Sequence, residues 1–281
     1  MGKQILDSRF FRENRAPGLP SPAEVRDINV KLGGLWSKNF HRPTPVKFPA
    51  LGMLVKYGAN TTIGEAETQK MVYDRLQGKV PIPEVYGWTT DGGQGFIYMA
   101  LIEGDTLEER WVTMSANERL AICSQLHGMV KEWRALQHTE NGLYIGSLNN
   151  QPLREFFLRQ EPALQGPYHG TDAVHRFHQG CDLDITGEVP VVFAHNDLLP
   201  PNILLTRGSN PSVVAVIDWA QSGWYPAYWE YCKLRRCTTN YFDDDDVQEE
   251  WESKHLPLIV DPVDEETFYH PFVWFYLSKG I

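Results

Sequence analysis

The sequence predicts an α+β protein in which a small, antiparallel sheet lobe with one main helix precedes a larger, mostly helical lobe. Strand-like runs dominate the N-terminal part of the chain, and helical periodicity dominates after about residue 103. With 281 residues, of which 42% are hydrophobic, the chain can bury a core in each lobe. We therefore expect an N-terminal lobe over residues 1–102 and a C-terminal lobe over residues 103–281.

The first helix is expected to begin after Ser21. Ser21 and Glu24 form the Ser-x-x-Glu pattern of a capping box, and Pro22 occupies the first helical position, which proline favours. Gly33-Gly34 then ends the helix. The later elements expected in this lobe are a strand over residues 51–57, a helix from Thr62 to about Leu76, an extended segment over 80–86, a turn at 91–93 and a buried strand over 95–102.

The second lobe is expected to open with a long helix, which Ser115 and Glu118 cap. Its apolar face is predicted to consist of Leu120, Cys123, Leu126, Val130, Trp133 and Leu136. Residues 139–190 are rich in loop signals, with a short helix near 153–158. The remaining elements expected are strands over 191–195, 202–206 and 213–217, and a helix over 228–240.

The most specific motif is His-Asn-Asp-Leu-Leu-Pro-Pro-Asn at residues 195–202. It fits the kinase catalytic-loop pattern H-R-D-L-x-x-x-N at every fixed position except one, where Asn196 replaces arginine. A strand precedes the motif, and the hairpin that follows it ends in Ile217-Asp218-Trp219. Asp218 therefore stands where a kinase keeps its metal-binding D-F-G aspartate.

These residue types suit phosphoryl transfer, which needs a carboxylate near the attacking hydroxyl and oxygen ligands that hold Mg²⁺ on the phosphates. Asp197 can serve the first role, and Asn202 and Asp218 can serve the second. Both aspartates could instead be simple turn formers, but the order and spacing of the two motifs favour the catalytic interpretation. We expect His195 to brace the loop rather than to transfer protons.

A lysine upstream could bind the phosphates of a nucleotide. Leu54-Val55-Lys56 resembles the end of the V-A-I-K strand of kinases, whose lysine pairs with a glutamate on the next helix. Glu65 and Glu67 both qualify, and we favour Glu65 because it lies in the first turn of the helix. The pattern Thr62-x-x-Glu65 is also a capping box, which is a purely structural explanation. Lys56 could likewise be a solvated lysine at a strand edge.

Together these motifs resemble the aminoglycoside phosphotransferase family, the small-molecule branch of the protein-kinase-like fold, which also includes choline kinases. The resemblance is carried by HNDLLPPNILL at 195–205 with VIDWAQSGWYPAYWEYCK at 216–233, and by VPIPEVYGW at 80–88 ahead of FIYMALIEGDTLEERW at 96–111. The motifs are similar to those of fungal members, and the resemblance covers roughly residues 45–240.

The resemblance implies a two-lobe, protein-kinase-like fold and an ATP-dependent kinase with adenine bound at the linker between the lobes. Met99 would then stand at the back of the nucleotide pocket, with Ala100 and Ile102 offering backbone hydrogen bonds to adenine. The chain departs from the kinase pattern ahead of Lys56, because no G-x-G-x-x-G lies there to cover the phosphates.

We therefore expect an ATP- and Mg²⁺-dependent phosphotransferase that acts on a hydroxyl group of a small molecule. The alternative is a kinase-like binding module, or a member with altered chemistry, that binds a nucleotide or metabolite without phosphorylating it. The missing glycine-rich loop slightly favours the alternative, and the retained polar residues favour the enzyme. The aromatic cluster within residues 224–231 could line a substrate pocket or pack in the core. Glu230 could meet a substrate amine, but a structural salt bridge is the more economical expectation.

Composition limits the partners and the compartment. The net charge of −10 argues against nucleic acid or an anionic membrane as a partner, and it tolerates a cationic small molecule as the hydroxylated substrate. The four cysteines are too few and too scattered for a disulfide scaffold. The apolar run at 272–277 is far shorter than the about 20 residues of a membrane span, and the first residues lack the pattern of a secretory signal. We expect a cytoplasmic protein.

Overall fold

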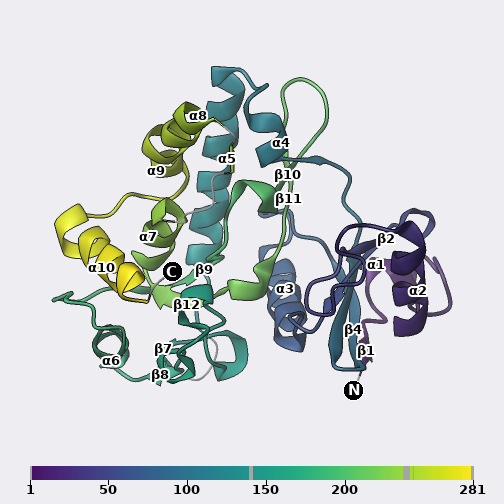
Figure 1. Ribbon diagram of the computed structural model, residues 1–281, viewed down its shortest axis with the longest axis horizontal. Helices are drawn as coiled ribbons and strands as arrows, with labels where there is room; N and C mark the ends of the chain where they lie inside the picture. Colours follow the sequence, from purple (N-terminus) through teal and green to yellow (C-terminus); the bar gives the residue numbers. More distant parts are fainter. Residues whose placement is uncertain (1, 139–141, 237–240, 243, 280–281) are drawn as a thin grey trace. The chain divides into compact units, whose positions relative to one another are not determined.

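The computed structural model describes residues 2–138, 142–236, 241–242 and 244–279. The chain divides into two compact units, Met1–Glu103 and Gly104–Ile281, which are treated separately below. Figure 1 shows that both units contain strands as well as helices, and the α+β class that the sequence predicts is confirmed.

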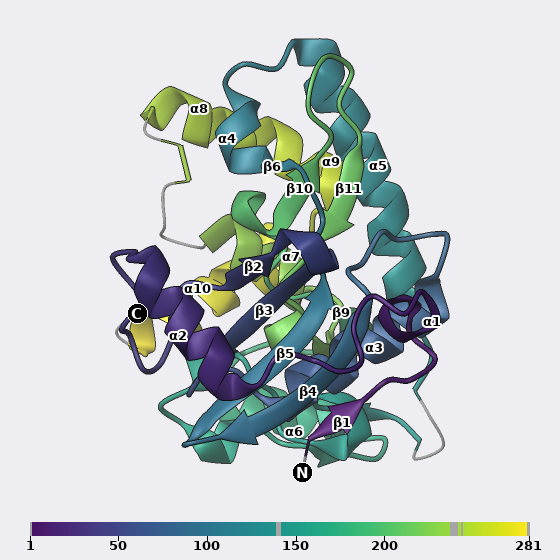
Figure 2. The same ribbon diagram turned by 90° about the vertical axis from the view of Figure 1, so that its right-hand side faces the viewer.

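The N-terminal unit contains a five-stranded antiparallel sheet in the order β1-β4-β5-β3-β2, which can be followed in Figure 2. Its strands are β1 (Lys3–Gln4), β2 (Val46–Phe48), β3 (Met53–Gly58), β4 (Val85–Asp91) and β5 (Gln94–Ala100). The strand predicted from residue 51 begins at Met53, because Pro49–Leu51 forms a short 3-10 turn that ends at Gly52. Gly52 has a φ of 57°, a conformation that glycine adopts without strain.

Helices cover both faces of this sheet. The helices of the unit are α1 (Arg9–Arg12), α2 (Pro22–Leu32) and α3 (Ile63–Leu76). Phe10 of α1 and Val25 of α2 belong to the same core cluster as Tyr98 of β5, whereas Ala66 of α3 belongs to the cluster that contains Ile97 of the same strand. Side chains alternate between the two faces of a strand, so Leu54 and the residue two positions later on β3 face α3. This alternation directs Lys56 toward α3.

The C-terminal unit is mostly helical, as predicted. Its helices are α4 (Leu107–Trp111), α5 (Ala116–Arg134), α6 (Ala173–Gly180), α7 (Trp229–Arg236), α8 (Asp245–Glu250), α9 (Leu256–Ile259) and α10 (His270–Ser278). Its strands are β6 (Asp105–Thr106), β7 (Tyr144–Ile145), β8 (Tyr168–His169), β9 (Val191–Ala194), β10 (Ile203–Leu205), β11 (Val213–Val216) and β12 (Gly223–Pro226). The sequence did not predict α6, and the end of the helix expected over 228–240 lies outside the described residues from residue 237.

The predicted helix caps are confirmed. Ser21 and Ser115 each accept a hydrogen bond from the N–H of the glutamate three residues later, and each glutamate bonds back to the cap N–H. Gly33 ends α2 in the left-handed conformation, with a φ of 64°. These interactions join residues that are close in sequence, and they follow from the local pattern alone.

The predicted apolar face of α5 needs two corrections. Leu136 lies two residues beyond the end of α5 and is only half-buried. Cys123, Leu126 and Trp133 are buried, but Leu120 is 49% exposed. A helix turns about 100° per residue, which puts Leu120 about 60° from Cys123 on the side away from Leu126. Leu120 therefore lies beyond the edge of the buried stripe.

The aromatic cluster of residues 224–231 belongs to the core. Trp224, Tyr225, Tyr228, Trp229 and Tyr231 are each at most 4% exposed, so the interpretation of this cluster as a substrate-pocket wall is wrong. Three of the cysteines, Cys123, Cys181 and Cys232, are buried free thiols, and Cys237 lies outside the described residues. No described helix combines the length and the apolar composition needed to cross a bilayer.

Two strand pairs bring the predicted catalytic residues of this unit together. β9 pairs with β12 through Ala194 opposite Gly223, and β10 pairs with β11 through Ile203 opposite Val216. The loop from β9 to β10 contains residues 195–202, and the loop from β11 to β12 contains residues 217–222. The start of one loop is paired with the end of the other, and its end with the other's start, so the two loops must lie side by side; Figure 1 labels the four strands.

Candidate functional site

Hydrogen bonds hold the two loops of the C-terminal unit against each other. The Ile217 N–H donates to the Asn202 carbonyl at 2.9 Å. At the other end, the Ser222 hydroxyl donates to the His195 carbonyl at 3.0 Å. The motif residues at 195–202 and the aspartate at 218 are therefore positioned by one shared scaffold.

His195 braces this scaffold. Its Nδ1 accepts a hydrogen bond from the Asp197 N–H at 3.2 Å, so the ring proton is on Nε2, which donates to the Ile217 carbonyl at 3.0 Å. The side chain is fully buried, and burial lowers the pKa of His195 to about 4. A neutral histidine with both nitrogens engaged orients the loop, which agrees with the bracing role that the sequence predicts.

Asp197, Asn202 and Asp218 meet at this point. The Asn202 amide nitrogen donates to the Asp197 carbonyl at 2.8 Å and to its carboxylate at 3.1 Å. Asp218 directly follows Ile217, whose N–H is bonded to Asn202, so the second aspartate is placed beside the first pair. Asp218 has a φ of 63°, which turns the chain sharply out of β11 into the 3-10 turn Trp219–Gln221.

The groups around Asp197 shift the pKa of its carboxyl in opposite directions. Burial raises the pKa of the Asp197 carboxyl, and the negative charges of Asp218 and Glu155 act the same way. The positive charge of Lys233 and a hydrogen bond from the Gln221 side chain oppose this rise. A carboxylate that is partly desolvated in this way binds a proton more readily than one in water, which suits a group that accepts a proton from a hydroxyl.

A buried ionic network lies behind this carboxylate, and sequence reasoning missed it. Glu155 accepts hydrogen bonds from Lys233 Nζ at 2.8 Å, from Asn196 Nδ2 at 2.5 Å and from Trp229 Nε1 at 2.9 Å. Lys233 also donates to Gln221 Oε1 at 2.7 Å. Asn196, which donates to Glu155, directly precedes Asp197 in the chain. The network thus connects the core of the unit to the candidate base.

Asn196 and Glu230 complete the support of the loop. Asn196 has a φ of 63°, a conformation that asparagine tolerates better than most residues, and its N–H donates to Glu230 Oε1 at 2.8 Å. The other Glu230 oxygen lies 3.6 Å from an Arg134 nitrogen. The structural salt bridge expected for Glu230 is confirmed. Glu230 and Lys233 are three residues apart on α7 and lie on the same helix side, but this spacing does not indicate which distant residues they contact.

The oxygen donors at the two loops fit Mg²⁺. Asn202 uses its amide nitrogen toward Asp197, which leaves its amide oxygen to face a cation, and Asp218 adds a carboxylate. In the ranges that the structure describes, no three His, Cys, Asp or Glu side chains form a metal cage. Mg²⁺ commonly binds through one or two protein groups and completes its shell with phosphate oxygens and water, so this donor set is sufficient.

In the N-terminal unit, Lys56 pairs with Glu65. Lys56 Nζ lies 2.5 Å from Glu65 Oε1, and the Glu65 side chain is almost completely buried. The Glu65 N–H also donates to the Thr62 hydroxyl at 3.2 Å. Of the two glutamates that the sequence left open, the structure places Glu65, and not Glu67, on this lysine.

The residues predicted around adenine lie at the end of β5. Met99 is buried between the sheet and α3, where its sulfur accepts a hydrogen bond from Gln69 at 3.6 Å. The Ala100 N–H donates to the Glu84 carbonyl at 2.8 Å, so a backbone hydrogen bond from Ala100 to adenine would use its carbonyl oxygen. Ile102 is half-buried, two residues beyond the strand.

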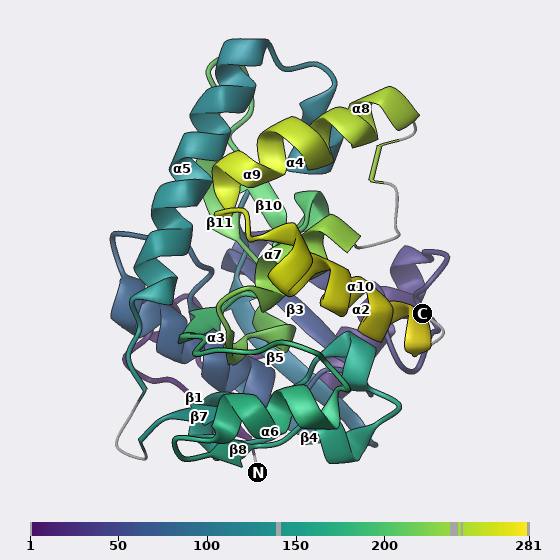
Figure 3. The same cartoon turned by 90° about the vertical axis from the view of Figure 1, so that its left-hand side faces the viewer.

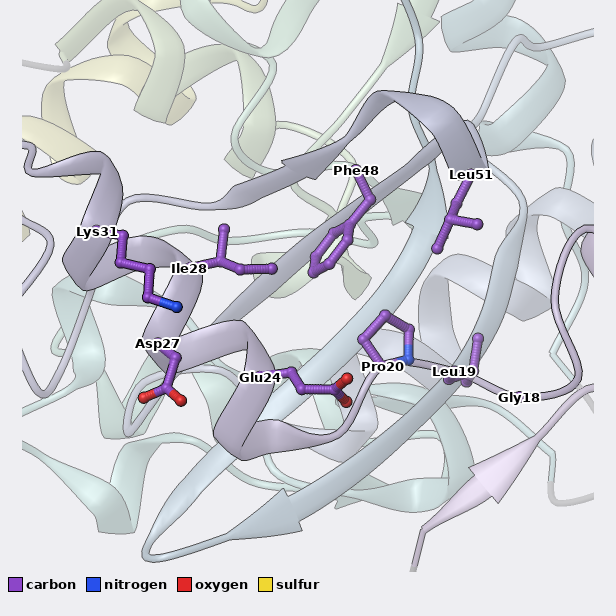
Figure 4. Close-up of a pocket in the computed structure, with 9 residues that line it drawn as sticks. All are labelled: Gly18, Leu19, Pro20, Glu24, Asp27, Ile28, Lys31, Phe48 and Leu51. Atoms are coloured by element: carbon purple, nitrogen blue, oxygen red, sulfur yellow. The ribbon is translucent and has the colours of Figure 1, made fainter.

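The N-terminal unit also has a hollow of about 390 Å³ beside α2, which Figure 4 shows in close-up. Ile28 and Phe48 form part of its apolar lining, and Glu24 and Lys31 lie at its edge. The Glu24 carboxylate is already bonded to Ser21 as the α2 cap. None of the predicted site residues lines this hollow.

Comparisons with known proteins identify relatives of the chain. A model of the phosphotransferase enzyme family matches residues 50–251. A subtelomeric hrmA-associated cluster protein of Aspergillus fumigatus is 23% identical over 184 residues, which are 60% of this chain and 34% of that protein. The match thus spans about a third of the length of this curated relative.

Solved structures show the same fold. The aminoglycoside phosphotransferase APH(3'')-Id from Streptomyces rimosus has a TM-score of 0.51 and 16% identity, and the alignment covers 90% of this chain and 98% of that one. A thermostable mutant of APH(4)-Ia in a ternary complex with AMP-PNP and hygromycin B has a TM-score of 0.50 and 15% identity, with 81% and 76% covered. The kinase-like fold that the sequence predicts is confirmed.

Proposed function

Because the chain belongs to the phosphotransferase enzyme family, we propose that it transfers the γ-phosphoryl group of ATP to a hydroxyl group of a small molecule, with Mg²⁺ as cofactor. The observation that carries this proposal is the arrangement of Asp197, Asn202 and Asp218 on two hydrogen-bonded loops. That arrangement combines a desolvated carboxylate with two hard oxygen donors, which is what phosphoryl transfer requires.

Asp197 is the proposed general base. The acceptor oxygen forms a bond to the γ-phosphorus while the bond from that phosphorus to the bridging oxygen breaks, and ADP leaves. The hydroxyl proton passes to the Asp197 carboxylate. The Asn202 amide nitrogen donates to this carboxylate at 3.1 Å, so that the base is oriented before the acceptor arrives.

Asn202 and Asp218 are the proposed ligands of Mg²⁺, which would neutralise charge on the phosphates when bound. The Asn202 amide is held by Asp197, so base and ligand have a fixed relation. Lys56 is proposed to bind the nucleotide phosphates, with Glu65 keeping its ammonium group in place. Met99, the Ala100 carbonyl and Ile102 are proposed to contact adenine.

These roles divide the chain functionally. We propose that residues 1–102 act as the nucleotide-covering lobe and that residues 103–281 supply the base, the metal ligands and the acceptor side. We further propose that the protein acts in the cytoplasm on a small molecule, without nucleic acid or membrane partners.

The first experiment is a titration of the purified protein with ATP, with and without Mg²⁺, while the melting temperature is followed. A ligand at about 100 times its Kd stabilises the native state by about 2.7 kcal/mol, which is a readily measured shift. We expect the shift to need Mg²⁺ and to disappear in Asp218→Ala. No shift with ATP or GTP at millimolar concentration would refute the proposal.

A second measurement separates an enzyme from a binding module. ADP formation is followed with a panel of hydroxylated molecules as acceptors. Acceptor-dependent ADP formation that is lost in Asp197→Ala supports transfer. Mg²⁺-dependent binding of ATP without ADP formation from any acceptor would instead favour the kinase-like binding module.

A further inference from the structure

The C-terminal unit has a hollow of about 510 Å³, which we call the Arg159 pocket. One side is formed by the segment that contains Phe156, Arg159 and Glu161, and the other side by Lys279 at the end of α10, drawn in yellow in Figure 3. This volume lies within the range of small-molecule binding sites.

The pocket adjoins the two candidate loops. The Phe156 N–H donates to Gln221 Oε1 at 3.0 Å, and the preceding residue, Glu155, accepts a hydrogen bond from Asn196, the neighbour of the candidate base. An acceptor hydroxyl must come within hydrogen-bond distance of the base that takes its proton. The Arg159 pocket is therefore suitably placed to hold the remainder of the acceptor molecule.

The charges of the lining do not suit a cation. Glu161 is the one carboxylate among the described lining residues, and it already pairs with Lys279 Nζ at 3.1 Å. Arg159 is exposed at the pocket, and no described side chain forms an ion pair with its guanidinium group. A bound cation would find no available carboxylate here and would face an uncompensated arginine.

The same lining suits an anion with an apolar face. Arginine binds carboxylates and other planar anions through two parallel hydrogen bonds. Phe156, 55% exposed, presents an aromatic ring on the same side of the pocket. Gln160 adds a neutral amide that can both donate and accept hydrogen bonds.

We propose that the Arg159 pocket binds the acceptor and that the acceptor is a hydroxylated organic acid with an apolar or aromatic part, not a polycation of the aminoglycoside type. The inference rests on the proposed function and deepens it by naming the substrate class. It also replaces the expectation, drawn from net charge, that the substrate could be cationic. Net charge describes the whole surface, whereas affinity depends on the groups that line the pocket.

The test compares two probes that share a ring and a hydroxyl group but differ in charge. 4-Hydroxyphenylacetate is the anion and tyramine is the cation, and longer hydroxylated acids and amines are added in matched pairs. Binding to the full chain is followed by calorimetry in the presence of AMP-PNP and Mg²⁺. We expect the acids to bind at least about tenfold more tightly than their amine partners.

A charge-reversal variant of Arg159 tests whether the acids bind in the Arg159 pocket. Arg159→Glu should weaken the binding of the acids by about tenfold or more and leave ATP affinity unchanged. Lys131→Glu is the matched control, because Lys131 is an exposed cation on α5 outside the pocket, and it should change neither affinity. Both variants alter exposed side chains, so we expect both to fold.

Several outcomes would overturn the inference. These are tighter binding of the amines, acid binding that Arg159→Glu does not weaken, a loss of ATP affinity in Arg159→Glu, and no binding by any acid at millimolar concentration. Failure of the proposed function would look different. Acids that bind in an Arg159-dependent manner without ADP formation would refute phosphoryl transfer and leave the pocket assignment intact. ADP formation from amines alone would refute the pocket assignment and leave the transferase intact.

Discussion

Lys56 Nζ lies 2.5 Å from Glu65 Oε1, and this ion pair joins β3 to α3 inside the N-terminal unit. Glu65 also uses its backbone N–H to bond with the Thr62 hydroxyl at the start of the helix. The capping and pairing roles that the sequence suggested for Glu65 are therefore compatible, because one uses the backbone and the other uses the side chain.

Removing the charge of Glu65 should weaken nucleotide binding. In Glu65→Gln, the Lys56 ammonium group loses a charged partner, and hydrogen bonds to charged groups are worth about 1.5–3 kcal/mol. We expect ATP affinity to fall by about tenfold in calorimetry. Glu67→Gln is the matched control on the same helix and should bind ATP as the parent protein does. Equal effects of the two variants would contradict the pairing.

Asp197→Asn should abolish turnover without unfolding the protein. General-base catalysis typically contributes about 10²–10⁴-fold, so we expect kcat to fall by about that factor. Because burial raises the pKa of Asp197, it already disfavours the charged form, and a neutral amide should keep the melting temperature. The exposed Asp184→Asn serves as the control. Retained turnover in Asp197→Asn would exclude it as the base.

The buried pair of Glu155 and Lys233 should be essential for stability. Lys233→Met leaves the Glu155 carboxylate, which is fully buried, without its cation, and breaking a buried pair costs about 3–5 kcal/mol. Urea denaturation should show this loss, and the double variant with Glu155→Gln should recover part of it. The surface pair of Lys70 and Asp74 is the control, since Lys70→Met should cost at most about 1 kcal/mol. Additive effects of the two buried changes would rule out direct coupling.

His195 should make stability depend on pH. Burial lowers the pKa of His195 to about 4, so between pH 6.5 and 4 the unfolded chain binds a proton that the folded chain does not. The stability from this residue is present above pH 6.5 and is lost as the pH falls, by about 1.4 kcal/mol per pH unit. Urea denaturation from pH 7.5 to 4.5 should give a shallower pH dependence for His195→Gln. Parallel curves for the two proteins would show that His195 titrates normally.

The elements of both units were largely predictable because their signals are local. Ser21, Thr62 and Ser115 each begin a helix where a cap pattern predicts it. The spacing of Asp197 and Asn202 within one loop identified that motif before any fold was known. α6 was missed because its eight residues are too few for a convincing apolar period. Leu120 was misplaced because its spacing is helical but its side chain lies beyond the edge of the buried face of α5.

The support of the candidate base could not be predicted from the sequence. Glu155 and Lys233 are separated by 78 residues, and no periodic pattern links them. Their contact exists because folding brings the segment before η3 (Phe156–Leu158) against α7 and buries both charges together. A charged residue buried in this way needs a partner, but the sequence does not say which residue will supply it.

The sequence by itself determined the kinase-like order of elements and the identity of the candidate catalytic and metal-binding side chains, because those depend on hydrogen bonds and spacings within a few residues. The tertiary structure alone decided that the aromatic residues at 224–231 pack in the core, that Glu65 and not Glu67 meets Lys56, and that Arg159 and Lys279 line one pocket. Burial and charge balance depend on which distant segments meet, and only the folded chain brings those segments together.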